Sequence, residues 1–155
     1  MKTHKNNQKE TKKKIDIEDH KAIALWAADC AEHVLPYFEK EYPTDDRPRK
    51  AIAAARAWAK GEIKMMDARK VAVAAHAAAR KAKDGAACAA ARSTGHAAGT
   101  AHMAAHAPHA ANYAVISAKA VGVTNEREWQ YSHLPSKLSY IKLYLRKDLK
   151  VSLRE

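Results

Sequence analysis

The segment from Ala86 to Val121 combines imidazoles with very small side chains. Among its many alanines and two glycines, Gly95 and Gly99, lie one arginine and four histidines: Arg92, His96, His102, His106 and His109. Small residues let helices approach closely, and this brings the imidazoles together. A polar patch in such a core is either a binding site or a hydrogen-bonded strut. The residues alone do not distinguish the two.

Two pairs of residues are spaced four positions apart, which places both members on one face of a helix. The pairs are Asp29 with His33 and His102 with His106. Imidazoles and a carboxylate are ligands suited to zinc, iron or manganese, so these four residues are the candidate metal ligands. Alanine-rich helices with several histidines also produce this spacing by chance. We therefore favour structural core histidines and expect no cofactor, with a metal such as zinc as the alternative.

Arg92 is the only lysine or arginine between Asp84 and Lys119. If its helix is central, the guanidinium is buried and must be paired. The available partners are Asp29 and Glu32, which predicts a salt bridge between the first and fourth helices. The alternative is an anion-binding cleft formed by Arg92 and the imidazoles.

Trp129 and His133 are one helical turn apart. We expect Trp129 to cover the core, while the functional alternative places both rings at the mouth of a pocket over His96. His76 is predicted on the exposed side of its helix and His109 near a break, so neither is expected in the site. No residue is proposed as catalytic. The candidate binding cluster is Asp29, His33, Arg92, His96, His102, His106, Trp129 and His133.

The elements that position these residues are predicted to be helices. Apolar residues recur every three or four positions, and no run alternates as a strand would. Asp19 is the expected cap of the first helix, which Pro36 should kink or restart. A fourth helix is expected from residue 86 to 106, and Gly61 and Gly122 mark two helix ends. The predicted fold is all-α, a compact alanine-rich bundle of about six helices with Trp26, Phe38, Trp58 and Trp129 as its large anchors.

Composition divides the chain into three parts. Every alanine lies between Ala22 and Ala120, which marks the folded body because alanine is the best helix former. Residues 1–15 are predicted to be a disordered basic leader and 16–136 a helical domain. Residues 137–155 are predicted to form a basic amphipathic helix that packs on the body, on a partner or on a second copy. The net charge of +11 comes mostly from the two ends, with six lysines against one glutamate in residues 1–14.

Two cysteines without a CxxC spacing, together with the lack of a secretory leader, predict reduced thiols and a cytoplasmic protein. The alanine-rich segment carries too many imidazoles to cross a bilayer cheaply, so no membrane association is expected. Basic ends without a basic face would bind nucleic acid only non-specifically.

Several short segments resemble the immunity-protein-5-like family. They are Ala27–Leu35, Arg47–Ala51, Gly95–His96, Ala101–Met103, His106–Ala107, Glu128–Gln130 and His133–Pro135. Together they span about residues 19–135. The resemblance implies a small helical protein that neutralises a cognate toxin by binding it, as in contact-dependent or polymorphic toxin systems. It implies nothing for the basic leader or the last helix.

Three functions follow in order of preference. The first is a non-enzymatic binding protein of the immunity type whose partner is a cognate toxin. The second is a metal-dependent or acid/base enzyme with a pocket of histidine, aspartate and arginine. The third is a nucleic-acid binder that uses the basic ends.

Overall fold

The computed structural model describes residues 15–145, which form six α-helices, one 3-10 helix and no strand. The prediction of an all-α, compact helical bundle is confirmed. The helices are α1 (Ile17–Glu39), α2 (Arg47–Ala59), α3 (Met65–Lys81), α4 (Gly85–Gly99), α5 (His106–Ala120), α6 (Glu126–Ser132) and the 3-10 helix η1 (Ser136–Tyr144).

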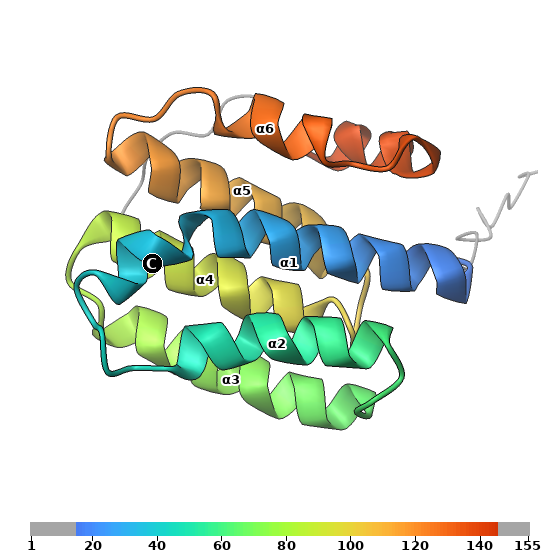
Figure 1. Cartoon of the computed structure of the whole chain (residues 1–155), viewed down its shortest axis with the longest axis horizontal. Coiled ribbons are helices and arrows are strands. Elements are labelled where there is room, and N and C mark those ends of the chain that lie inside the picture. The colour runs from blue at the N-terminus through green and yellow to red at the C-terminus, as the bar shows by residue number, and fades with distance from the viewer. Residues whose placement is uncertain (1–14, 146–155) are drawn as a thin grey trace, which may run out of the picture.

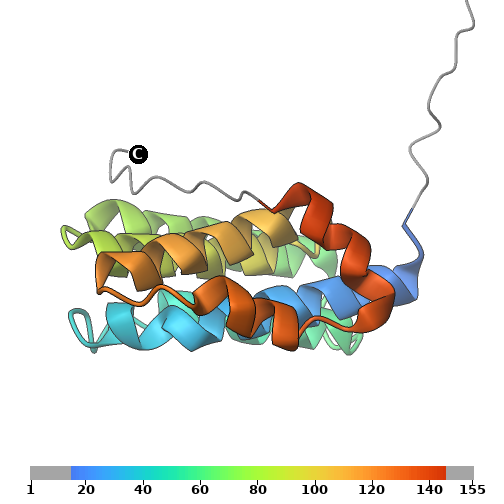
Figure 2. The ribbon, with the colours of Figure 1, turned by 90° about the horizontal axis from the view of Figure 1, so that it is seen from above.

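The long helices form two layers. One layer contains α1 and α2, and the other contains α3, α4 and α5, while α6 runs along the edge beside α1 and α5 (Figures 1 and 2). Helix α4 is central: α3 and α5 flank it, and α1 packs against it from the other layer. All of its residues except Gly85, Cys88, Arg92 and His96 are buried. One narrow strip of α4 therefore reaches solvent, on the side away from α1.

The core contains many alanines and a few large side chains. Alanine methyl groups let the helix backbones approach closely, but each buries little apolar area, so bulky residues must fill the remaining space. Trp26, Phe38, Leu35 and Leu138 are the largest apolar side chains that are fully buried. Trp58 and Trp129, which we expected as further anchors, are only partly buried.

Helix α1 begins earlier than expected and is not restarted by its proline. Its N-cap is Asp16, whose Oδ1 accepts the Glu18 N–H at 3.2 Å, and Asp19 lies in the first turn. The helix continues through Pro36 to Glu39. The missing N–H of Pro36 removes one bond of the ladder, and the helix ends soon afterwards at Glu39.

Helix α4 ends at Gly99, so the expected continuation to His106 is wrong. The N–H and the hydroxyl of Thr100 both donate to the His96 carbonyl, at 3.0 Å each. A local side-chain bond of this kind competes with helix propagation. Residues 100–105 then turn, and α5 starts at His106. The predicted ends at Gly61 and Gly122 are confirmed by φ values of 76° and 83°, a region that favours glycine.

Helix η1 packs on the body through Leu138 and Ile141, which are buried, and the buried Leu145 follows it. The Lys137 ammonium lies 3.5 Å from the carboxylate of Asp19 on α1. Tyr140, Leu143 and Tyr144 point outward. The predicted leader, up to residue 14, and the end of the predicted last helix, from residue 146, lie outside the described residues.

Within residues 15–145, no helix is both long and apolar enough to cross a bilayer.

Candidate binding site

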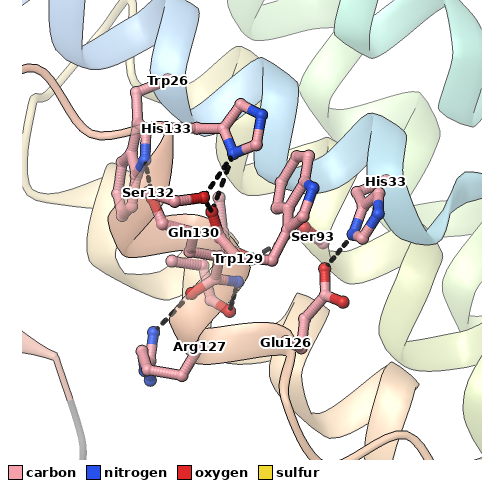
Figure 3. A network of polar contacts seen from close by, with 11 residues as sticks. Trp26, His33, Ser93, Glu126, Arg127, Trp129, Gln130, Ser132 and His133 are labelled. Carbon is pink, nitrogen blue, oxygen red and sulfur yellow. Dashed lines mark hydrogen bonds and ion pairs between the residues drawn. The ribbon is translucent and has the colours of Figure 1, made fainter.

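Three rings stack on the surface where α1 meets α6. The imidazole of His33 lies parallel to the indole of Trp129, with ring centroids 3.6 Å apart and an interplanar angle of 2°. His133 covers the other side of Trp129 at 4.1 Å. Figure 3 shows the indole between the two imidazoles. Because residues 129 and 133 are one turn apart on α6, the helix itself positions the second pair. We call His33, Trp129 and His133 the aromatic stack.

Both imidazoles of the aromatic stack are fixed through Nδ1. His33 Nδ1 lies 2.5 Å from Oε1 of Glu126, whose side chain is 4% exposed. His133 Nδ1 lies 2.8 Å from the Trp129 carbonyl oxygen and 3.0 Å from the Ser132 hydroxyl. Carboxylate and carbonyl oxygens only accept, so each Nδ1 donates to its oxygen. When these imidazoles are neutral, each Nε2 is an acceptor.

Buried hydrogen bonds hold α6 in place. The indole N–H of Trp26 donates to the Gln130 carbonyl at 2.9 Å, and the Gln130 amide donates to the Ala111 carbonyl at 2.9 Å. Arg127 donates to Gln130 Oε1 at 2.8 Å and to Asn112 Oδ1 at 2.6 Å. Burial lowers the pKa of Arg127. These bonds join α1, α5 and α6, so the aromatic stack stands on a rigid support.

An ion-pair network lies beside the stack on α1 and α2. Arg56 donates to Glu32 at 2.6 Å and to Asp29 at 2.9 Å. The hydrogen bond between Glu32 and Arg56 lowers the pKa of the Glu32 carboxyl and raises the pKa of the Arg56 guanidinium. Glu32 and Arg56 also line a shallow hollow on this surface, together with Arg49, Ile52, Ala53, Ala57, Lys60 and Glu62. This part of the surface therefore carries both charges in fixed positions.

A second group of imidazoles gathers on α3, α4 and α5. Nδ1 of His96 lies 3.0 Å from Nδ1 of His106, so one of these nitrogens donates and the other accepts. The ring centroid of His96 also lies 4.8 Å from His76, 5.2 Å from His109 and 5.3 Å from Tyr113. We call His76, His96, His106 and His109 the histidine cluster.

The two glycines of α4 make room for the histidine cluster. A Cβ atom at Gly95 would lie 2.7 Å from Cε1 and Nε2 of His76, and one at Gly99 would lie 3.2 Å from Cγ of His106. The imidazoles thus pack directly on the helix backbone, one from each flanking helix.

The surroundings of the histidine cluster disfavour positive charge. Burial, followed by the charges of Arg92 and His106, lowers the pKa of His76 to about 4. Burial and the neighbouring imidazoles lower the pKa of His96 to about 3, and the pKa of His106 is lowered for the same reasons. These three imidazoles are neutral at physiological pH.

A protein-family model described as Imm-5 like putative immunity protein matches residues 13–137. The chain belongs to this family. No curated protein and no solved structure matches it. The Imm-5 like match confirms the resemblance inferred from the short segments, and it contains both the aromatic stack and the histidine cluster.

The predicted salt bridge from Arg92 to Asp29 or Glu32 is wrong in this Imm-5 like protein. Both carboxylates pair with Arg56 on α2. Arg92 lies on the strip of α4 that faces away from α1, where its guanidinium donates to Nδ1 of His76 at 3.1 Å. Helices α1 and α4 do pack together, but these charged side chains point to different faces.

The predicted cluster of eight residues is split between two faces. His33, Trp129 and His133 come together, and Asp29 lies one turn from His33 on α1. His96 and His106 meet on the other face with Arg92 nearby. His102 is exposed in the turn after α4, because the helix that should have carried it ends at Gly99.

The rings of Trp129 and His133 stack with His33, whereas the ring contacts of His96 are all within its own cluster or with Tyr113. The predicted pocket mouth over His96 is therefore wrong. The four candidate metal ligands, Asp29, His33, His102 and His106, do not converge. Across residues 15–145, no three histidine, cysteine, aspartate or glutamate side chains are placed to hold a metal ion.

Sequence reasoning missed His76, His109, Tyr113 and Glu126. His76 lies four residues after Ala72 and three before Ala79, both in the buried stripe of α3. That spacing was a signal that His76 borders the core. Glu126 gave no such signal, since its burial depends on how α6 lies beside α1 (Figure 1).

Both cysteines are free thiols. Cys30 is fully buried, and burial raises the pKa of its thiol well above the ordinary value. This supports the prediction that Cys30 behaves as a small apolar residue and not as a nucleophile.

Proposed function

We propose that this Imm-5 like protein neutralises a cognate toxin by direct binding, without catalysis, and that the aromatic stack is the centre of the contact. The family match supports the immunity assignment. We choose this surface because of the aromatic stack, in which three rings are held on a rigid support and are partly exposed to solvent.

The geometry of the stack suits a protein contact. Tryptophan is enriched among the residues that contribute most to binding energy at interfaces, especially where it is preorganised. Trp129 is partly exposed and held from both sides, so ordering it on binding costs little entropy. The Nε2 atoms of His33 and His133 can accept hydrogen bonds from a partner's hydroxyl, amide or ammonium groups.

The ion pairs on α1 and α2 extend this surface. Asp29, Glu32 and Arg56 are partly exposed, and each has a fixed neighbour of opposite charge. Such groups at the rim contribute specificity more than affinity. The formal charge of +11 would speed association with a partner that is acidic overall.

The function is tested with the products of the reading frames beside the gene. Each is expressed alone, and any product that arrests growth is co-expressed with the full chain. We expect the chain to restore growth and to bind the purified product at equal stoichiometry in calorimetry. If no neighbouring product is toxic, or if the chain does not bind a toxic one, the immunity assignment fails.

The surface is tested with Trp129→Ala in the same calorimetry. We expect Kd to rise at least about 30-fold, since truncating a central anchor costs 2 kcal/mol or more, on the order of a hot-spot residue. Trp58→Ala is the matched control, because Trp58 is also a partly buried ring in contact with a histidine, His20, at 4.6 Å between centroids, away from the aromatic stack. Equal losses for the two variants would exclude the stack as the centre of the contact.

A further inference from the structure

The face formed by α3, α4 and α5 carries almost no negative charge. Residues 65–125 contain two acidic residues: Asp67, in the first turn of α3, and Asp84, which caps the N-terminus of α4 by accepting the Ala87 N–H. The same residues contain seven lysines and arginines, which are Arg69, Lys70, Arg80, Lys81, Lys83, Arg92 and Lys119. The two layers of the fold thus differ in charge. The layer of α1 and α2 carries both signs, and the layer of α3, α4 and α5 is mostly positive.

Arg92 is the cation of this face that lies on its central helix, α4. It is half-buried on the narrow strip of α4 that reaches solvent, with α3 on one side and α5 on the other. Ala91 and Ser93 beside it are fully buried. The guanidinium is therefore partly removed from water but open on one side.

No carboxylate within residues 15–145 forms an ion pair with Arg92. Its hydrogen-bond partner is the imidazole of His76, which accepts a single bond through Nδ1. Arg47 and Arg49 each donate to one carboxylate through two nitrogens. Arg56 donates to two different carboxylates. A partly desolvated guanidinium usually has such a partner, because desolvation without one is costly.

We infer that Arg92, together with the imidazoles of His76 and His96, forms a site for an oxyanion, either a carboxylate or a phosphate group. The planar guanidinium donates in a fork that matches two oxygens of such a group. While His76 is neutral, its Nδ1 occupies one donor of the guanidinium and leaves the others for a ligand, and protonation of His76 at Nδ1 would release that donor too. A metal cation does not fit this position, because Arg92 is positively charged and the Nδ1 atoms of His96 and His106 bind each other.

Binding at this site is coupled to protonation. The groups that face His76 and His96 are Arg80 on α3, Arg92 on α4, and His106 and His109 on α5, with His102 beside His106. They carry positive charge or acquire it on protonation, and with burial they keep the pKa values of His76 and His96 low. An anion at Arg92 offsets that repulsion and raises both pKa values. The protein then takes up protons when it binds, so the anion binds more tightly as the pH falls.

The test is imidazole 15N–1H NMR of the full chain, titrated from about pH 2.5 to 7.5 so that both midpoints are covered. Sulfate is the probe for a tetrahedral phosphate-like group and formate for a carboxylate, each compared with chloride at equal ionic strength. We expect one or both to raise the pKa values of His76 and His96 by about one unit, a tenfold stronger preference for the protonated form. His133, on the opposite layer's edge, is the internal control and should not respond.

Arg92→Gln should abolish the shift, whereas Arg69→Gln, which replaces an exposed arginine of α3, should retain it. Shifts that are equal in chloride, or that persist in Arg92→Gln, would overturn the inference. If Arg92→Gln does not fold, Arg92→Lys decides, since it keeps the charge but loses the fork. A reduced shift in that variant supports the site, and an unchanged one overturns it. The outcome is independent of toxin binding, because no partner protein is present.

Discussion

The aromatic stack and the histidine cluster place the same side chain in opposite electrostatic surroundings. On the α1–α6 surface, His33 donates to the buried carboxylate of Glu126. On the α3–α4–α5 face, the imidazoles contact one another and Arg92, and three of them have lowered pKa values. The number of histidines thus says little about their chemistry. What decides it is whether a carboxylate or another cation lies within reach of each ring.

The largest expected effect tests the packing of the histidine cluster. Gly95→Ala should lower the free energy of unfolding by about 2–3 kcal/mol, because the new methyl group meets the ring of His76 at 2.7 Å. Urea denaturation measures the loss. Adding His76→Ala should recover part of it in a double-mutant cycle. Additive losses would show that the ring is not the obstacle.

The second effect is a pH dependence that only the histidine cluster should produce. His76 and His96 have pKa values of about 4 and about 3 in the fold, against an ordinary value of 6.5. Below pH 6.5 the unfolded chain binds more protons, so stability is full above that pH and falls as the pH decreases toward 4. We expect a loss on the order of 2 kcal/mol between about pH 7 and pH 5 from urea denaturation.

Replacing both histidines with glutamine should flatten this pH dependence. His133→Gln, which removes an exposed imidazole of the aromatic stack, is the control and should leave the slope unchanged. If His133→Gln flattened the pH dependence of the free energy of unfolding and the double replacement did not, the dependence would come from the aromatic stack and not from the histidine cluster.

A smaller loss is expected where a carboxylate holds the imidazole. Glu126→Gln keeps the shape of the side chain but removes its charge, so the free energy of unfolding should fall by about 1–2 kcal/mol. Glu128→Gln, an exposed acid on the same helix, should change it by less than about 0.5 kcal/mol. Tryptophan fluorescence would report both unfolding and any loosening of Trp129. Equal stabilities for the two variants would mean that Glu126 does not support the stack.

The smallest effect belongs to the ion pairs beside the stack. A double-mutant cycle of Arg56→Met and Glu32→Gln should give a coupling energy below about 1 kcal/mol, because both side chains are partly in water. The coupling should weaken further in high salt. A coupling of several kcal/mol would place these charges among the main supports of the fold.

The fold was predictable because its signals are local. These signals are the apolar spacing of three and four residues, the alanine-rich stretches, and the glycines Gly61 and Gly122. Each one indicates a helix or a helix end from residues that are close together in the sequence. The end of α4 was not predictable in this way, since the helix ends at Gly99 without a left-handed glycine and Thr100 still donates its N–H to the His96 carbonyl. Because α4 ends at Gly99, His102 lies in the turn that follows and His106 at the start of α5, so no single helix pairs them.

The site was less predictable because it depends on how each helix is rotated about its axis. Helices α1 and α4 pack together as expected, yet Asp29 turns toward α2 and Arg92 toward α3. The number of acidic residues in α3, α4 and α5 was visible in the sequence, but its meaning required knowing that these helices form one layer. Glu126 entered the site because α6 lies beside α1 (Figure 1), where its carboxylate reaches His33.

Because Cys30 is buried, the rate at which its thiol is labelled can report how often α1 separates from the helices around it. The sulfur of Cys30 is fully enclosed, near Glu126 and Arg127 of α6, while Cys88 on α4 is partly accessible. A thiol reagent should therefore modify Cys88 promptly and Cys30 only when α1 separates from its neighbours. The ratio of the two labelling rates would give the free energy of that opening, and a bound partner on the outer side of α1 should slow the reaction of Cys30 without touching it.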